Sequence, residues 1–292
     1  MLKSLDNFFK NNAILLILCS FPICVLLRST AINLFFVSIS LFFLFKFKNY
    51  KNIIFERWVI IFFIFLIYTS FTSLFSEDQF ASLRSSISQL RFILFVIFLS
   101  LLKIDKYTLK KVINFTMLII IFVCLDVFYQ YFYGHDIFGF KPGDPKTVPD
   151  RLSGPFNQEL IVGAFIYYIS IPVIAHYFYI FKKRNLIKKF AILLFSSLVF
   201  FTILISGERM AFILFTASLL VILIVNFNYK KILLFLTTLI LLTILIFNLN
   251  KSVNNRITDF LKDISNFKNS NHYKLFASAV GIWKDKPLIG RG

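Results

Sequence analysis

Long apolar runs separated by short polar segments dominate this sequence and decide what the chain can fold into. A helix needs ~20 apolar residues to cross the ~30 Å hydrocarbon core of a membrane. About nine runs approach that length, and they cover residues 12–28, 30–46, 58–75, 87–102, 112–133, 158–180, 190–206, 210–227 and 232–249. We therefore predict an all-α protein, a polytopic transmembrane helix bundle spanning residues 1–250.

The composition supports a membrane protein rather than a water-soluble domain. Of the 292 residues, 58% are hydrophobic and 41 are Phe, and the mean hydropathy is +0.79. A typical soluble domain is only ~45–50% apolar. The surplus apolar surface must therefore face lipid.

The positive charge of the chain predicts its orientation in the membrane. The formal net charge is +18, but the Lys and Arg residues gather in short loops between apolar runs, which disfavours a nucleic-acid partner. With the N-terminus in the cytoplasm, the predicted cytoplasmic segments hold more than twice as many Lys and Arg as the opposite side up to residue 250. The positive-inside rule thus places the N-terminus in the cytoplasm and residue 250 outside.

Two predicted external segments stand out. Residues 134–157 are rich in Gly and Pro, which marks irregular backbone. Residues 251–292 carry apolar side chains at helical spacing, first over 253–267 and again over 273–283, with polar residues between them. We expect 251–292 to be the start of a large periplasmic loop with amphipathic helices.

Two external arginines are candidate anion ligands. Arg209 lies in the tight turn Ser-Gly-Glu-Arg between two predicted spans, and Arg151 ends the irregular loop just before another span. A guanidinium group can pair two phosphate oxygens at once, and two such groups match a diphosphate. The alternative for Arg209 is an interfacial side chain that snorkels to lipid phosphates.

Three further charged residues lie at or near the predicted outer face. Glu208 could orient an arginine, act as a base, or be a solvated turn residue. Asp126, in the outer half of a predicted span, needs a partner in the membrane, and Arg91 on the preceding span is the obvious candidate. A structural ion pair between these two residues is the favoured interpretation, and a proton relay is the alternative.

The sequence offers no cofactor or metal signature. Cys19, Cys24 and Cys124 lie inside apolar runs without a CxxC motif, and the three histidines lack metal-ligand spacing. No Walker motif, dinucleotide fingerprint or serine-hydrolase elbow occurs. We expect no cofactor and no metal site.

Three motifs in order resemble the O-antigen ligase and O-antigen polymerase superfamily. They are Arg151-Leu-Ser-Gly-Pro-Phe, then Ser206-Gly-Glu-Arg, then Trp283-Lys-Asp-Lys-Pro-Leu-Ile-Gly-Arg-Gly. The resemblance covers residues 150–292 through motifs and the first 150 residues through hydropathy.

The resemblance implies a bacterial inner-membrane glycosyltransferase that transfers an undecaprenyl-diphosphate-linked glycan on the periplasmic face. The acceptor is lipid A–core in lipopolysaccharide biosynthesis by ligases, and another lipid-linked repeat unit in polymerases. Related enzymes glycosylate proteins. Arg151 and Arg209 match the arginines that hold the donor diphosphate, and the implied partners are the donor, the acceptor and membrane lipids.

The sequence departs from the family pattern in three places. Asn157-Gln158-Glu159 stands where the family often has Asn-Pro-Asn, and His272 stands where Arg is common. The loop histidine that ligases use as the base would lie beyond Gly292. We therefore expect a chain that is truncated and catalytically incomplete, with its catalytic residues unidentified.

Two alternatives belong to other classes. A non-enzymatic polysaccharide flippase would explain the spans and the intramembrane charges, but not an amphipathic external segment from residue 251 or the absence of a hydropathy repeat. A structural membrane scaffold is the third interpretation.

Overall fold

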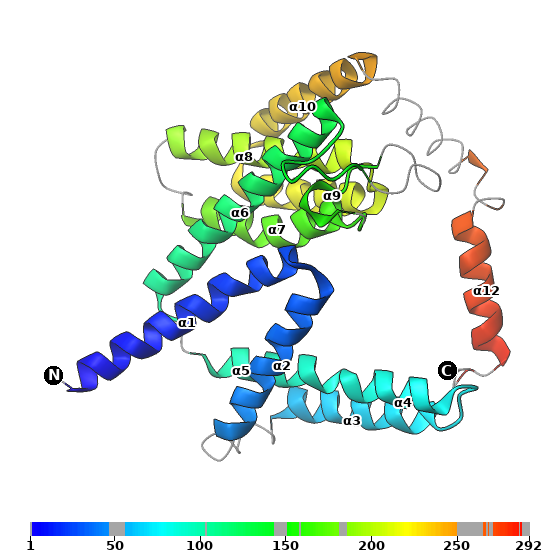
Figure 1. The fold of residues 1–292 in the computed structure, drawn as a ribbon. Helices are drawn as coiled ribbons and strands as arrows, with labels where there is room; N and C mark the ends of the chain where they lie inside the picture. The colour runs from blue at the N-terminus through cyan, green and yellow to red at the C-terminus, as the bar shows by residue number, and fades with distance from the viewer. Residues whose placement is uncertain are drawn as a thin grey trace. The chain divides into compact units, whose positions relative to one another are not determined.

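The computed structural model of the chain describes residues 2–46, 56–102, 104–142, 151–157, 159–180, 186–249, 265–266, 268, 271–285 and 287. Helices dominate these residues, and no strand occurs among them, so the predicted all-α class is confirmed (Figure 1). The elements are α1 (Leu2–Leu26), α2 (Arg28–Lys46), α3 (Arg57–Ser73), α4 (Gln79–Ser88), α5 (Leu90–Leu101), α6 (Lys106–Tyr133), η3 (Gly154–Phe156), α7 (Val162–Ile180), α8 (Leu186–Ser206), α9 (Arg209–Asn226), α10 (Tyr229–Leu249) and α12 (Asn271–Asp285).

Five helical segments of the described chain are long and apolar enough to cross a membrane. They are Gln79–Leu101, Lys106–Tyr133, Val162–Ile180, Ile187–Ser206 and Arg209–Asn226. Three shorter apolar helices cover Ala13–Leu26, Ser29–Phe45 and Arg57–Ser73. The chain is therefore a multi-pass membrane protein, whereas the nine-span topology and the cytoplasmic N-terminus stay predictions.

Two helices begin earlier than their apolar runs, because an aspartate caps each start. The Asp105 carboxylate accepts hydrogen bonds from the backbone N–H groups of Tyr107 and Thr108, so α6 begins at Lys106 rather than 112. Asp78 accepts from the Ala81 N–H at 3.0 Å and opens α4 at Gln79, where the apolar run predicted a span from 87. Caps thus extend these helices beyond the residues that face lipid.

The helices group into two compact units. The first comprises Met1–Arg28 and Asp105–Asp259, and the second comprises Ser29–Ile104 and Phe260–Gly292. The boundary predicted near residue 250 and most of the first predicted amphipathic helix lie outside the described residues. The second predicted amphipathic helix is α12.

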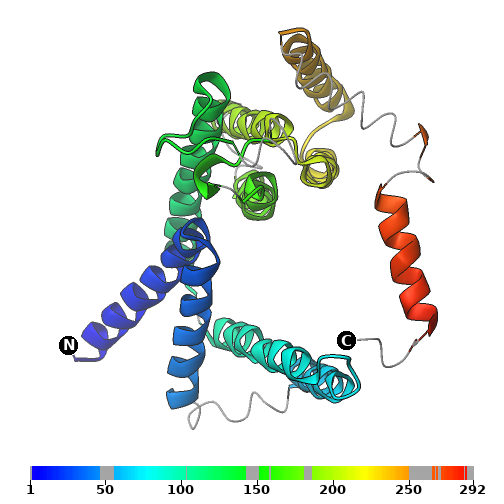
Figure 2. The ribbon, with the colours of Figure 1, turned by 45° about the vertical axis from the view of Figure 1, so that its right-hand side comes forward.

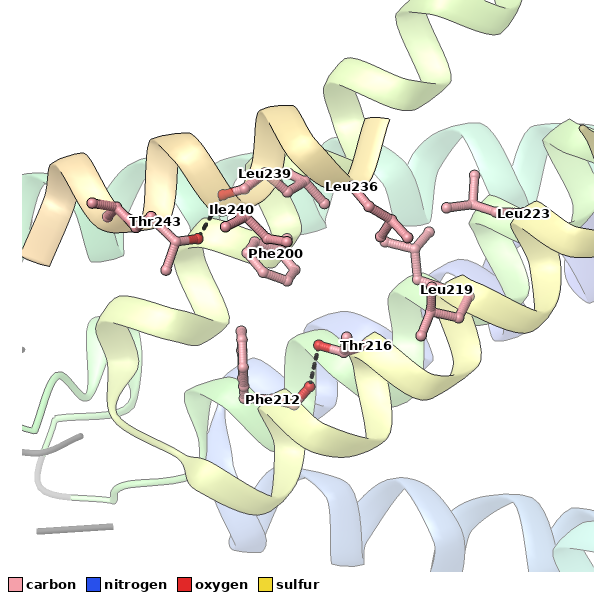
Figure 3. Close-up of a pocket in the computed structure, with 11 residues that line it drawn as sticks. Phe200, Phe212, Thr216, Leu219, Leu223, Leu236, Leu239, Ile240 and Thr243 are labelled. Carbon is pink, nitrogen blue, oxygen red and sulfur yellow. Dashed lines mark hydrogen bonds between the residues drawn. The ribbon is translucent and has the colours of Figure 1, made fainter. Parts of the chain in front are cut away.

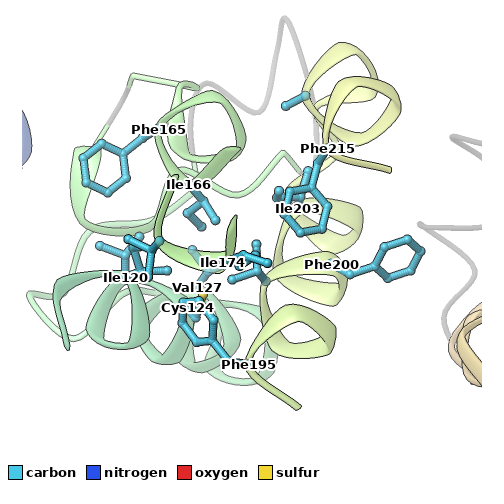
Figure 4. Close-up of a cluster of buried hydrophobic side chains, with 14 of the residues drawn as sticks. Ile120, Cys124, Val127, Phe165, Ile166, Ile174, Phe195, Phe200, Ile203 and Phe215 are labelled. Atoms are coloured by element: carbon cyan, nitrogen blue, oxygen red, sulfur yellow. The ribbon is translucent and has the colours of Figure 1, made fainter. Parts of the chain in front are cut away.

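Helix α7 is the central helix of the first unit, and α6, α8 and α9 pack against it (Figure 2). Their facing side chains form one apolar core, including Ile120 and Val127 of α6, Ile166 of α7, Ile203 of α8 and Phe215 of α9 (Figure 4). In a membrane, where lipid tails are as apolar as these side chains, close van der Waals packing rather than removal from water stabilises this core. Large apolar side chains on the outer faces, such as Leu118 and Val221, remain exposed as expected for lipid contact.

In the second unit, α3, α4 and α5 pack together and α2 lies against α5. The Ser73 and Ser86 hydroxyls form a 2.6 Å hydrogen bond between α3 and α4. The Ser40 hydroxyl donates to the Arg91 carbonyl, and the Phe36 ring contacts the Phe92 ring edge-on.

Candidate functional site

The segment that carries Arg151 is anchored in the core of the first unit. Leu152 and Phe156 are buried, and the Phe156 ring lies 5.1 Å from the ring of Phe165 on α7. Gly154 has a φ of +53°, and a Cβ there would approach a Val127 methyl group to 2.8 Å, so only glycine suits this position. These contacts fix the backbone next to Arg151.

Gln130 near the end of α6 clamps the same segment. Its side-chain oxygen accepts hydrogen bonds from the N–H groups of Ser153 and Gly154, at 3.0 and 2.9 Å. Its amide nitrogen donates to the Ser153 hydroxyl and to the Phe140 carbonyl. One buried side chain thereby satisfies the irregular backbone on both sides of the loop.

Asp126 lies one turn before Gln130 and is fully buried. Its Oδ1 accepts a 2.8 Å hydrogen bond from the Ile137 backbone N–H. Its Oδ2 has no hydrogen-bond partner among the described residues, and it lies 3.6 Å from the Cβ position of Gly154. Asp136 is also buried, and its carboxylate accepts from the Phe140 N–H at 2.6 Å. The Asp126 carboxylate fastens residues 136–140 to the end of α6, and the Asp136 carboxylate closes the turn within that segment.

A tight turn joins α8 to α9 and carries Glu208. Gly207 has a φ of +80°, a left-handed conformation that glycine adopts without strain. Glu208 precedes the first residue of α9, yet its side chain does not cap that helix. The carboxylate turns instead toward α7.

Glu208 caps the N-terminus of α7. Its Oε1 accepts a 2.8 Å hydrogen bond from the Gly163 N–H, and its Oε2 accepts a 3.0 Å hydrogen bond from the Ala164 N–H. These amides are in the first turn of α7, where no carbonyl of the same helix is available to them. The negative carboxylate also interacts favourably with the positive end of the helix.

Gly163 permits this approach. A Cβ at that position would lie 2.9 Å from the Glu208 Cβ and 2.9 Å from the Ser206 Oγ. The beginning of α7 therefore touches the turn between α8 and α9 without space for any side chain.

Arg151 joins the same cluster. Its Nη2 lies 3.9 Å from Glu208 Oε1 and donates to the Leu160 carbonyl at 3.3 Å. The Arg151 side chain is 27% exposed and that of Glu208 is 11% exposed. The Arg151 Nε is buried and has no partner among the described residues. One edge of the guanidinium is thus held by protein, which leaves other donors for a ligand.

Opposing influences act on the pKa of Glu208. Burial raises its pKa, while the hydrogen bonds from Gly163 and Ala164 and the charge of Arg151 lower it, and the net direction is upward. Both oxygens are already occupied by N–H donors, so Glu208 is poorly placed to take a proton from a substrate. It is well placed to orient Arg151.

Arg209 follows Glu208 directly and is the first residue of α9. The N-terminal ends of α7 and α9 therefore meet at Glu208, and helix N-termini favour negative charge. Two arginines and one glutamate give these side chains a net positive charge.

The structure thus brings Arg151, Glu208 and Arg209 together at one end of the first unit. Arg91 belongs to the second unit, where its guanidinium lies 4.8 Å from the ring centre of Phe92. The predicted ion pair of Arg91 with Asp126 would join the two units and stays a prediction. Sequence reasoning missed Gly163 and the Gln130 clamp. The polar Gln130 in an apolar run was the available signal, whereas Gly163 gave none.

An apolar groove runs from this end between α9 and α10, and we call it the outer groove (Figure 3). Its volume is about 400 Å³, and its walls include Phe200, Phe212, Leu219, Leu236 and Ile240. The hydroxyls of Thr216 and Thr243 bond to carbonyls one turn back on their own helices, so they add little polarity. The groove can therefore accept a hydrocarbon chain.

Comparison with known proteins identifies the C-terminal part of the chain. A family model described as O-antigen ligase matches residues 190–292. No curated protein and no solved structure matches the chain. The matched part contains Glu208 and Arg209, while Arg151 precedes it. Over residues 190–292, the chain is therefore similar to the O-antigen ligase family that its motifs resemble.

Proposed function

We propose that this protein is a glycosyltransferase that moves a glycan from undecaprenyl diphosphate to an acceptor on the periplasmic face of the bacterial inner membrane. Lipid A–core is the proposed acceptor. A second lipid-linked repeat unit or a protein would take its place in a polymerase or in a protein-glycosylating enzyme. The family match supports membrane glycan transfer of this general type.

The convergence of Arg151, Glu208 and Arg209 at two helix N-termini carries the proposal. Arg151 and Arg209 would bind the donor diphosphate through charge-assisted hydrogen bonds. Glu208 would hold Arg151 at 3.9 Å and keep its remaining donors turned toward the ligand. A polar cluster of this kind beside an apolar groove matches a ligand with a charged head and a long isoprenoid chain.

The reaction needs no redox change. A hydroxyl oxygen of the acceptor would form a bond to the anomeric carbon of the glycan, while the bond between that carbon and the diphosphate oxygen breaks. The electron pair of the broken bond leaves with undecaprenyl diphosphate, and a base takes the proton of the acceptor hydroxyl. The two guanidinium groups would stabilise the negative charge that grows on the leaving diphosphate.

The outer groove supports binding of the lipid part of the donor. Phe212 lies in the first turn of α9, three residues after Arg209, and it lines the groove. A diphosphate on Arg209 would thus place the first isoprene units at the groove entrance, where close van der Waals contact with the apolar walls would hold the chain.

The test is complementation of a strain that lacks its glycan ligase, with the lipopolysaccharide ladder on a gel as the readout. The gene would be expressed in its native reading frame, with Arg151→Ala and Arg209→Ala beside the wild type. Arg84→Ala is the matched control, because Arg84 is an exposed arginine on α4. All variants would be compared at equal membrane abundance.

We expect a ladder from the wild type and from Arg84→Ala, and none from the other two variants. A ladder that survives both substitutions would refute the diphosphate assignment. A well-expressed wild type that gives no ladder in several acceptor backgrounds would refute ligase activity. Assays with lipid-linked repeat units or protein acceptors would then separate the remaining family activities.

A further inference from the structure

A second groove lies at the opposite end of α9, and we call it the basic groove. It has a volume of about 700 Å³ and lies between α8, the end of α9 and the beginning of α10. Its lining is Lys189, Phe190, Leu193, Leu194, Ser197, Leu223, Asn226, Phe227, Asn228, Lys231, Ile232, Leu234, Phe235 and Thr238.

The basic groove has two chemically different parts. Lys189 near the start of α8, and Asn228 and Lys231 near the start of α10, supply polar groups at one end. The Lys189 Nζ lies 5.9 Å from the ring centre of Phe227, which keeps this charge at the groove. Farther along the helices the walls are apolar, with Leu193 on α8 and Phe235 on α10. The site therefore matches an amphiphile with an anionic head and hydrocarbon chains.

The basic groove is separate from the proposed donor site. Helix α9 begins at Arg209, ends at Asn226 and is 18 residues long. At 1.5 Å per residue the two ends are about 27 Å apart, close to the thickness of a hydrocarbon core. The two charged sites therefore lie near opposite membrane surfaces, and the charge pattern of the sequence assigns Lys189 and Lys231 to the cytoplasmic surface.

We infer that the basic groove binds an anionic glycerophospholipid of the cytoplasmic leaflet. The phosphate would lie between Lys189 and Lys231, and an acyl chain would lie along Leu193 and Phe235. Basic pockets between helices on this side of a membrane are suited to anionic headgroups. The inference depends on the predicted orientation and not on the proposed glycan transfer.

Native mass spectrometry of the protein in a neutral detergent tests this inference. The probes are 1-palmitoyl-2-oleoyl phosphatidylglycerol and the corresponding phosphatidylethanolamine. The variant is Lys189→Ala/Lys231→Ala, and its matched control is Lys188→Ala/Lys230→Ala, which removes the same charge from exposed neighbours that do not line the groove. Thr238→Phe fills the apolar part from the exposed side of α10.

The wild type and the control pair should prefer phosphatidylglycerol to the same degree. The groove pair should lose about twenty-five-fold in phosphatidylglycerol affinity, since each of the two lysines near a lipid surface contributes about fivefold. Thr238→Phe should weaken binding of both lipids while the thermal unfolding midpoint stays unchanged. Soluble glycerophosphoglycerol, which has the headgroup without acyl chains, should not compete.

Four results would overturn the inference. Equal losses in the groove and control pairs would mean general surface attraction. Unchanged phosphatidylglycerol affinity in the groove pair would show that the two lysines do not bind the headgroup. Effective competition by glycerophosphoglycerol would show that the acyl chains do not contribute to binding. A dimer that disappears in the groove pair would make the groove an interface between two copies. None of these readouts depends on glycan transfer, so a failure of the lipid-binding inference can be distinguished from a failure of the proposed function.

Discussion

Glu208 accepts a 2.8 Å hydrogen bond from the backbone N–H of Gly163, 45 residues away in the sequence. This contact attaches the beginning of α7 to the turn between α8 and α9, and it requires a glycine because a Cβ would lie 2.9 Å from two neighbouring side-chain atoms.

The substitution Gly163→Ala should therefore destabilise the protein by about 1–3 kcal/mol, the usual range for overpacking a close contact. Gly281→Ala is the control, because Gly281 in α12 has open space around its Cβ position. There alanine should stabilise the helix by about 0.5–1 kcal/mol. Denaturant titration in detergent measures both changes, and a Gly163→Ala protein as stable as the wild type would contradict the observed packing.

Glu208 should make the stability depend on pH. Burial raises its pKa above the ordinary value of 4.5, so the folded protein holds this proton to higher pH than the unfolded chain does. The contribution of this group is largest below pH 4.5 and decreases as the pH rises through the folded pKa. Above that pKa no further change is expected from this residue.

Glu208→Gln should abolish that slope and lower the stability by about 1–2 kcal/mol, because the neutral amide caps α7 with one oxygen instead of two. Thermal unfolding midpoints across pH 4 to 7 provide the comparison. An identical slope in wild type and variant would assign the titration to another group.

Arg151→Lys should keep the positive charge and still lower activity. A lysine cannot hold Glu208 and the Leu160 carbonyl while also offering a planar pair of donors to a phosphate. We expect activity to drop by about tenfold to a hundredfold, the equivalent of one charge-assisted hydrogen bond. Titration of the donor in a membrane-based transfer assay measures this loss, and full activity in the variant would mean that charge alone suffices.

Gln130→Ala should destabilise the protein by about 2–6 kcal/mol. The substitution leaves the buried N–H groups of Ser153 and Gly154 without an acceptor, at about 1–3 kcal/mol each. Gln79→Ala, at an exposed position in α4, should change the stability by less than about 0.5 kcal/mol. Similar unfolding curves for the two variants would argue against the clamp.

The substitution Asp126→Asn tests whether the partner of Asp126 is a backbone N–H group or the predicted partner Arg91. Asparagine keeps the oxygen that accepts from Ile137 and removes a charge next to Asp136, so little or no loss of stability is expected. If Arg91 were the partner, the substitution would leave a buried cation unpaired at a cost of about 3–5 kcal/mol. Asp126→Ala should be destabilising in either case, and the comparison of the two variants by denaturant titration decides between the partners.

The sequence predicted the helical class and the positions of most helices, because lipid-facing runs must be apolar over a fixed length. It located the starts of α4 and α6 poorly, since Asp78 and Asp105 set those ends through local hydrogen bonds rather than through hydropathy. The positions of Arg151, Glu208 and Arg209 at the end of the bundle could be predicted from hydropathy. Charges beside long apolar runs are conspicuous.

The hydrogen-bond partners of these charged residues could not be predicted from the sequence. Glu208 and Gln130 both bind backbone N–H groups of segments distant in the sequence, and an N–H group belongs to nearly every residue type. Gly163 is one small residue in an apolar run, and its importance comes from a contact with Ser206 and Glu208 that only the packed helices create. Asp126 illustrates the same limit, because the search for a charged partner overlooked the Ile137 amide.

The contact between Glu208 and the start of α7 also makes the α7–α8 pair a closed ring. The polypeptide chain connects the end of α7 to the start of α8. At the other end of the pair, the carboxylate of Glu208, which follows Gly207, is hydrogen-bonded to the start of α7. Residue insertions that do not change Gly207 or the start of α7 would leave this hydrogen bond in place, whereas one residue inserted at Gly207 would rotate the carboxylate away from α7 and open the ring. Tolerance to insertion should therefore differ sharply between the two ends of the same helical hairpin.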